Sequence, residues 1–162
     1  MAYKSPCVTQ THATECAIVV KEKRTNIPVD SRTIALAAAR AADGKMATDI
    51  IIQDVQDLFK VTDYFVIVTG QNNRQVDAIA DEVEEKLRED CGVKPIGQEG
   101  RDDCSWILLD YGDVIVHIFQ PAIREFYRLE TLWNDAPIID VAQADIEHPP
   151  YSERIGKIAG RA

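Results

Sequence analysis

Two apolar runs and one amphipathic stretch organise the middle of the chain. Residues 49–55 contain three consecutive isoleucines, and residues 64–69 are YFVIVT. Such runs are typical of strands covered on both faces. Between residues 73 and 91, apolar side chains recur at helical spacing while most other positions are acidic. The apolar stripe of this predicted helix is Val76, Ile79, Ala80, Val83 and Leu87.

Further elements lie on both sides of this centre. Ser31 is a candidate N-cap for a helix that ends at Gly44, and Pro121 suits the first turn of a last helix. A weaker strand is expected at residues 93–101, and two more on either side of the turn at residues 110–113. The last helix carries Ile123, Phe126, Tyr127, Leu129 and Trp133, of which Tyr127 and Trp133 are expected to pack, with contact to a partner subunit as the alternative for Trp133. The order predicts an α/β fold with a mixed five-stranded sheet flanked by helices.

The chain divides into three predicted parts. Residues 1–30 lack periodicity and are expected to form a flexible N-terminal extension, residues 31–137 form the domain, and residues 138–162 form a mostly irregular C-terminal tail. The aliphatic run at residues 17–20 is too short for a signal-peptide core, and no run approaches the length of a spanning helix. We therefore expect a soluble protein without a membrane partner. A cytoplasmic location is favoured, and the Thr-rich extension leaves an organellar one open.

Charge narrows the class of partner. The formal net charge is −9, and between residues 43 and 135 acidic residues outnumber basic ones by 20 to 9. Free nucleic acid is disfavoured as a partner, because phosphate binding needs a basic surface. A cationic protein surface suits this acidic body better. The four cysteines show neither CxxC pairing nor a metal-ligand spacing with histidine, so we expect no metal and no cofactor.

Four blocks of the sequence resemble the ribosomal silencing factors, the Iojap-like family. They are TDYFVIVTG (residues 62–70), RQVDAIADEVEEKL (74–87), WILLDYGDVIVHIF (106–119) and REFYRLETLWNDAP (124–137). The resemblance implies a nucleotidyltransferase-like fold without transferase activity. It also implies binding to the large ribosomal subunit through ribosomal protein fourteen, which blocks joining of the small subunit and represses translation. Isolated members often dimerise, which leaves a homodimer open.

Two other functions stay open as alternatives. A large-subunit assembly factor would use the same surface. A divergent nucleotidyltransferase would need a Gly-Ser loop and two carboxylates at i and i+2, which would share one face of a strand. Here Gly70 is followed by Gln71, and Asp110 and Asp113 are three residues apart. We therefore expect no enzyme activity and no catalytic residue.

The predicted docking residues lie in and beside the turn at residues 110–113. Strict alternation would place Trp106 and Asp110 on one face of a strand and Leu109 and Tyr111 on the other. Trp and Tyr concentrate binding energy at interfaces, and carboxylates would orient a basic partner. We predict Trp106, Asp110, Tyr111 and Asp113 as contacts, with Leu109 as secondary support. A core aromatic and turn-forming aspartates are the alternatives, and His117 is expected to be a half-buried histidine with its polar atoms satisfied.

Overall fold

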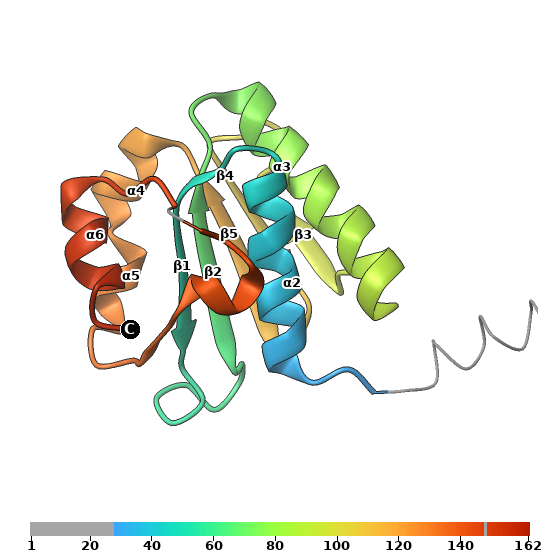
Figure 1. Ribbon diagram of the computed structural model, residues 1–162. Coiled ribbons are helices and arrows are strands. Elements are labelled where there is room, and N and C mark those ends of the chain that lie inside the picture. Colours follow the sequence, from blue (N-terminus) through green and yellow to red (C-terminus); the bar gives the residue numbers. More distant parts are fainter. Residues whose placement is uncertain (1–27, 148) are drawn as a thin grey trace, which may run out of the picture.

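A six-stranded mixed sheet forms the centre of the protein (Figure 1). The computed structural model describes residues 28–147 and 149–162, so most of the predicted N-terminal extension lies outside the described residues. The strand order is β3-β4-β5-β2-β1-β6. Only β2 and β5 run parallel; the other neighbours are antiparallel. The strands are β1 (Thr48–Asp54), β2 (Tyr64–Thr69), β3 (Gly97–Glu99), β4 (Trp106–Asp110), β5 (Val114–Phe119) and β6 (Ile138–Ile139).

The predicted count of five strands is wrong, because β6 adds a sixth. This strand has only two residues, which pair with Ile52 and Gln53 at the outer edge of β1. Two residues are too few for any recognisable alternation of apolar and polar positions. The strand is therefore visible only from its pairing in the tertiary structure.

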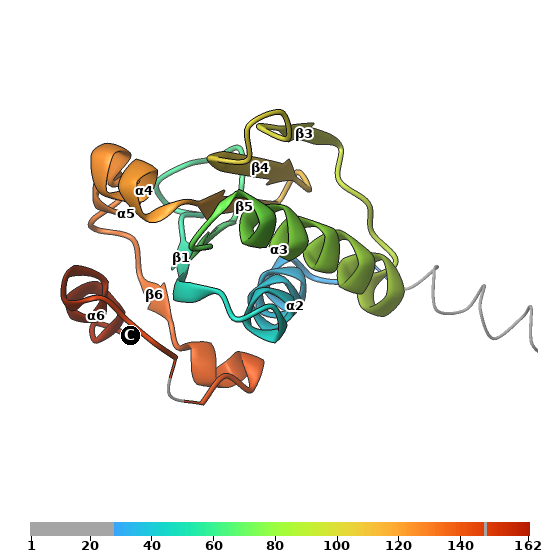
Figure 2. The same cartoon turned by 90° about the horizontal axis from the view of Figure 1, so that it is seen from above.

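Two long helices cover one face of the sheet (Figure 2). They are α2 (Ser31–Gly44) and α3 (Asn73–Lys86), and α3 continues into a π-helical turn, η1 (Leu87–Cys91). All five residues of the predicted α3 stripe are buried, which confirms the helical periodicity. The N-cap of α2 is Asp30 rather than Ser31, since the Asp30 carboxylate accepts a hydrogen bond from the Thr33 amide.

The opposite face carries two short helices in place of one long helix. These are α4 (Pro121–Tyr127) and α5 (Leu129–Leu132), separated by Arg128 in the left-handed region at φ 46°. The break changes the direction of the chain, so the side chains after it do not continue the face of α4. Leu129 and Trp133, which follow the break, pack against a second, smaller hydrophobic cluster. Its buried members are Val55, Phe65, Ile67, Phe119 and Ala136.

The described residues after Pro137 include three short regular elements, whereas a mostly irregular tail with at most a short helical piece is predicted there. The elements are β6, a 3₁₀ turn η2 (Val141–Ala144) and α6 (Glu153–Ala159). This segment follows the outer edge of β1: the Asp54 amide donates to the Pro137 carbonyl, and the Asp49 amide to the Pro150 carbonyl. The Tyr151 hydroxyl also donates to the carbonyl of Ile50. The segment therefore covers a sheet edge that would otherwise be open to pairing.

The described helices were compared with the requirements for a membrane-spanning helix. None of those in residues 28–147 and 149–162 has the length and hydropathy needed to cross a bilayer.

Candidate functional site

Strand β4 has one buried and one partly exposed face. Ile107 and Leu109 are fully buried in the cluster under α2 and α3, whereas Trp106, Leu108 and Asp110 are partly exposed on the other face. This agrees with the predicted alternation. In a strand of about 3.3 Å rise per residue, Trp106 and Asp110 stand about 13 Å apart at its two ends. Trp106 and Asp110 therefore share one face of β4 but lie at its opposite ends, whereas Leu109 lies on the other, buried face.

Trp106 is held in a defined orientation. Its indole stacks on Phe119, with ring centroids 4.8 Å apart, and its Nε1 donates a 3.1 Å hydrogen bond to Nδ1 of His117. Tyr127 of α4 packs against the same indole at a centroid distance of 5.1 Å. A large aromatic side chain that is half-exposed and already ordered loses little entropy on binding, which suits an interface anchor.

Two aromatic residues of α4 extend this surface towards solvent. Phe126 is 78% exposed and Tyr127 is 51% exposed, and their rings meet edge to face at 5.0 Å. The exposed place of Phe126 was missed by sequence reasoning, which identified it only as an apolar residue of the last helix. We call Trp106, Phe126 and Tyr127 the aromatic face.

The turn after β4 is built by Asp110. Its Oδ1 accepts a 2.7 Å hydrogen bond from the Gly112 amide, and Gly112 has φ +83°, a conformation that favours glycine. Asp113 is exposed. Tyr111 is half-buried, and its hydroxyl is buried with no hydrogen-bond partner among the described residues; burial raises its pKa. Asp110 thus has the turn-forming role, while the Asp113 side chain is accessible to a partner.

Leu109 does not belong to this surface. Its exposed fraction is 0%, and it packs in the core under α2 and α3. Contact with a partner would require β4 to leave the sheet, so its predicted supporting role is wrong. The alternation that separated Leu109 from Trp106 already contained the reason.

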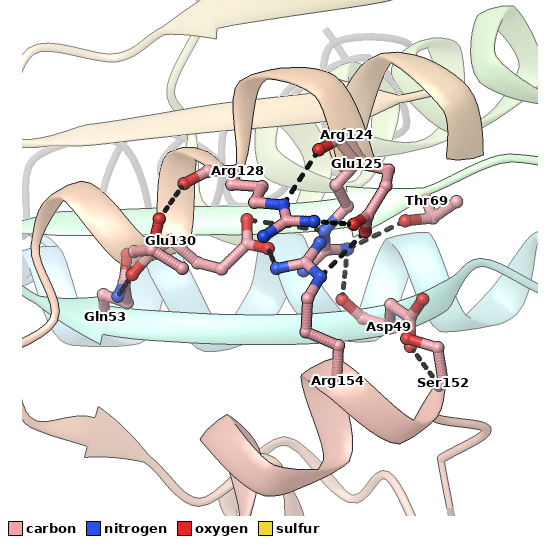
Figure 3. A network of polar contacts seen from close by, with 10 residues as sticks. Asp49, Gln53, Thr69, Arg124, Glu125, Arg128, Glu130, Ser152 and Arg154 are labelled. Atoms are coloured by element: carbon pink, nitrogen blue, oxygen red, sulfur yellow. Dashed lines mark hydrogen bonds and ion pairs between the residues drawn. The ribbon is translucent and has the colours of Figure 1, made fainter.

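The buried ion pair beneath α4 and α5 was also missed by sequence reasoning. Arg124 is 2% exposed and Glu130 is 0% exposed, and Arg124 Nε lies 3.6 Å from Glu130 Oε2 (Figure 3). Arg124 Nη1 also donates to the Asp49 carbonyl and to Thr69 Oγ1, at 2.5 and 2.8 Å. Arg154 of α6 forms the second ion pair of Glu130. Burial lowers the pKa of Arg124 to about 10. The network fixes the helix that carries Phe126 and Tyr127.

The residues considered for metal binding and nucleotide transfer are placed as follows. The Asp110 carboxylate is engaged in its own turn, and the residue after Gly70 is Gln71. Within the part of the chain that the structure describes, no group of three or more His, Cys, Asp or Glu side chains is placed to hold a metal ion.

The His117–Trp106 pair gives stability a defined pH dependence. Burial lowers the pKa of His117 from 6.5 to about 4, so the unfolded chain binds a proton over this interval that the native chain does not. The stabilisation is complete above about pH 6.5 and is lost as pH falls towards 4. We expect the free energy of unfolding, from urea denaturation, to fall by about 2 kcal/mol between about pH 7 and 5. His117→Gln should remove most of this loss; an equal loss in both proteins would contradict the assignment.

The geometry defines a class of protein: an α/β domain whose mixed sheet carries an ordered, partly exposed aromatic face at one end of β4 and an exposed carboxylate, Asp113, beyond the other end. Comparison with known families then identifies the family. Residues 28–157 match the family model RsfS, "Ribosomal silencing factor during starvation". The chain belongs to the ribosomal silencing factor family.

Individual relatives agree with this assignment. The chain is 41% identical to the ribosomal silencing factor RsfS of Bacillus subtilis over 113 residues, which are 70% of this chain and 95% of the relative. It is 40% identical to the chloroplastic protein Iojap of Zea mays over 67% of this chain and about half (47%) of that protein. A crystal structure of a Chromobacterium violaceum protein, 38% identical, covers 65% of this chain and 87% of its own with a TM-score of 0.63.

Proposed function

We propose that this protein represses translation by docking on the large ribosomal subunit, through ribosomal protein fourteen, and blocking the joining of the small subunit. The observation that carries the proposal is the aromatic face: Trp106, held by His117 and Phe119, next to the exposed Phe126 and Tyr127 of α4. Membership of the silencing-factor family supports the choice of partner. The protein acts by occupying a surface, and no bond is made or broken.

The exposed aromatic rings of this face and the negative charge of the chain suit a partner protein with a basic surface. Aromatic anchors supply most of the binding free energy of an interface, and flanking charges set orientation and association rate. Asp113 is exposed beside the turn and the whole chain carries a net charge of −9, so a cationic surface would be attracted. We place the protein in the cytoplasm, with an organelle as the alternative. A second copy of the chain is a further candidate partner.

A role in large-subunit assembly is the second candidate. The observation in its favour is a mouse relative, "Mitochondrial assembly of ribosomal large subunit protein 1", which is 36% identical over 93 residues. An assembly factor would bind immature large subunits more tightly than mature ones, whereas a silencing factor would hold mature subunits. A nucleotidyltransferase-like ancestry of the fold is compatible with either role. Mg²⁺-dependent nucleotide transfer that is abolished by Asp110→Ala would overturn both.

Capture of purified large subunits by the tagged protein tests the docking face. We expect Trp106→Ala and Phe126→Asp each to weaken binding by about tenfold or more, because each removes an aromatic anchor. Asp113→Lys should weaken it less and mainly slow association. Met46→Asp is the matched control, since Met46 is 80% exposed but lies outside the aromatic face. If folded Trp106→Ala and Phe126→Asp proteins capture subunits as well as wild type does, the face is not the docking surface.

A further inference from the structure

The C-terminal segment borders an apolar cavity that is open to solvent and that the docking face does not use. Its volume is about 480 Å³, and it lies among β6, η2 and α6. The aliphatic lining comes from β1, β6, η2 and the segment after η2, and consists of Ile50, Ile138, Ile139, Val141 and Ile146. On the side of α6 the wall is made of small residues, Gly156, Ala159 and Gly160. A cavity of this size and lining accommodates several aliphatic side chains.

Two carboxylates border the same cavity. Asp140 and Glu147 both line it. Asp140 accepts a hydrogen bond from the Ala142 amide, and neither carboxylate forms an ion pair with a lysine or arginine of residues 28–147 or 149–162. A segment with aliphatic side chains and adjoining positive charges would therefore complement both the apolar lining of the cavity and the negative charge of Asp140 and Glu147.

The chain itself contains a segment with this chemistry, outside the described residues. Residues 17–20 are Ala-Ile-Val-Val, and they are followed by Lys21, Lys23 and Arg24 with a single acid, Glu22, between them. Three cations and one anion give residues 21–24 an excess of two positive charges. Aliphatic side chains followed directly by cations are the two kinds of group that an aliphatic lining with two carboxylates would take up.

The start of the described chain contacts one of the elements that line the cavity. Val29 packs against the core, and Arg32 in the first turn of α2 donates a 2.6 Å hydrogen bond to Gln143 of η2. Because η2 contributes Val141 to the cavity, the start of α2 lies beside one wall of it. Residue 28 follows residue 20 by about eight positions, and a chain of that length spans up to about 28 Å.

We propose that residues 17–24 dock in this cavity of their own chain, with the aliphatic side chains inside and the cations against Asp140 and Glu147. The docked segment would hold α6 and η2 together over the outer edge of β1. This contact is independent of the aromatic face, so the proposal stands or falls separately from the proposed function.

A disulfide trap tests the contact directly, because Cys16 immediately precedes the segment. We would place a cysteine at the cavity wall with Ala142→Cys, in a chain whose Cys7, Cys91 and Cys104 are replaced by alanine. Under oxidised glutathione we expect Cys16 to form an intramolecular disulfide with this introduced cysteine. The bond should form at least about tenfold faster than with Ala122→Cys, a matched exposed position on α4, since a disulfide needs Cα atoms within about 7 Å. Charge reversal of Lys21, Lys23 and Arg24 to glutamate should slow the trap.

Hydrogen exchange gives a second readout in the full chain with its own cysteines. Ile18→Asp combined with Val19→Asp should raise amide exchange in α6 by about threefold or more, because the segment no longer holds it, whereas Val8→Asp should not. Equal trapping rates at positions 142 and 122, or unchanged exchange in α6, would overturn the proposal. So would a trap that links two chains and grows faster with protein concentration, since a second copy would then be the occupant.

Discussion

Replacing Glu130 with alanine is expected to lower the free energy of unfolding by about 3–5 kcal/mol. Glu130 is fully buried and is the carboxylate that faces both Arg124 and Arg154 (Figure 3). Its removal leaves the Arg124 guanidinium in the interior without a counter-charge, and the desolvation cost of that charge is no longer offset. Urea denaturation at neutral pH measures the change.

A matched control lies in the same network. Glu125 pairs with Arg128 and Arg154 but stands at the surface, where solvent screens its charge, so Glu125→Ala should lower the free energy of unfolding far less than Glu130→Ala. The buried position of Glu130, and not the number of its ion pairs, is what the comparison isolates. A loss in Glu130→Ala no larger than in Glu125→Ala would show that the interior does not depend on this charge.

Replacing Gly100 with alanine is expected to lower the free energy of unfolding by about 2–5 kcal/mol and to displace Trp106, the proposed docking anchor. Gly100 has φ +85°, and a Cβ at this position would overlap the Trp106 carbonyl oxygen. This carbonyl oxygen belongs to the backbone, so it cannot move away from the new Cβ by a rotamer change, as a side-chain atom could. β4 would have to move at the residue that anchors the aromatic face, so we expect large-subunit capture to weaken together with stability.

Gly97→Ala is the control for this substitution. Gly97 lies in the neighbouring strand β3, and a Cβ there would meet no atom within 4 Å. Urea denaturation should therefore show a change within about 0.5 kcal/mol. Equal stabilities of the two variants would contradict the clash at Trp106.

Much of the fold could be predicted from periodicity. The α3 stripe, the strands at residues 64–69 and on either side of the turn at 110–113, and the start of a helix at Pro121 all match the structure. These elements bury side chains at a fixed period, and that period is present in the sequence. The helix break at Arg128 and the two-residue strand β6 depend on tertiary packing. Neither produces a periodic pattern of apolar residues, so the sequence does not reveal them.

The candidate site was predicted in part. Alternation along β4 put Trp106 on the opposite face from Leu109, and the structure agrees. The contribution of Phe126 depends on the direction in which α4 presents its side chains, and the burial of Arg124 and Glu130 depends on elements far apart in the chain. Arginine and glutamate in a short helix are usually exposed to solvent, so residue type alone predicted that Arg124 and Glu130 would lie at the surface.

By itself, the sequence determined the α/β class, the acidic body and the family, because periodicity, charge and the four blocks are properties of residue order. Only the tertiary structure decided which aromatic side chains remain open, that Leu109 is unavailable, and that the segment after Pro137 closes the sheet edge. The exposure of a side chain depends on which residues from distant parts of the chain pack around it. Here these residues come from β5 and α4, which pack against Trp106, and from α6, which pairs with Glu130.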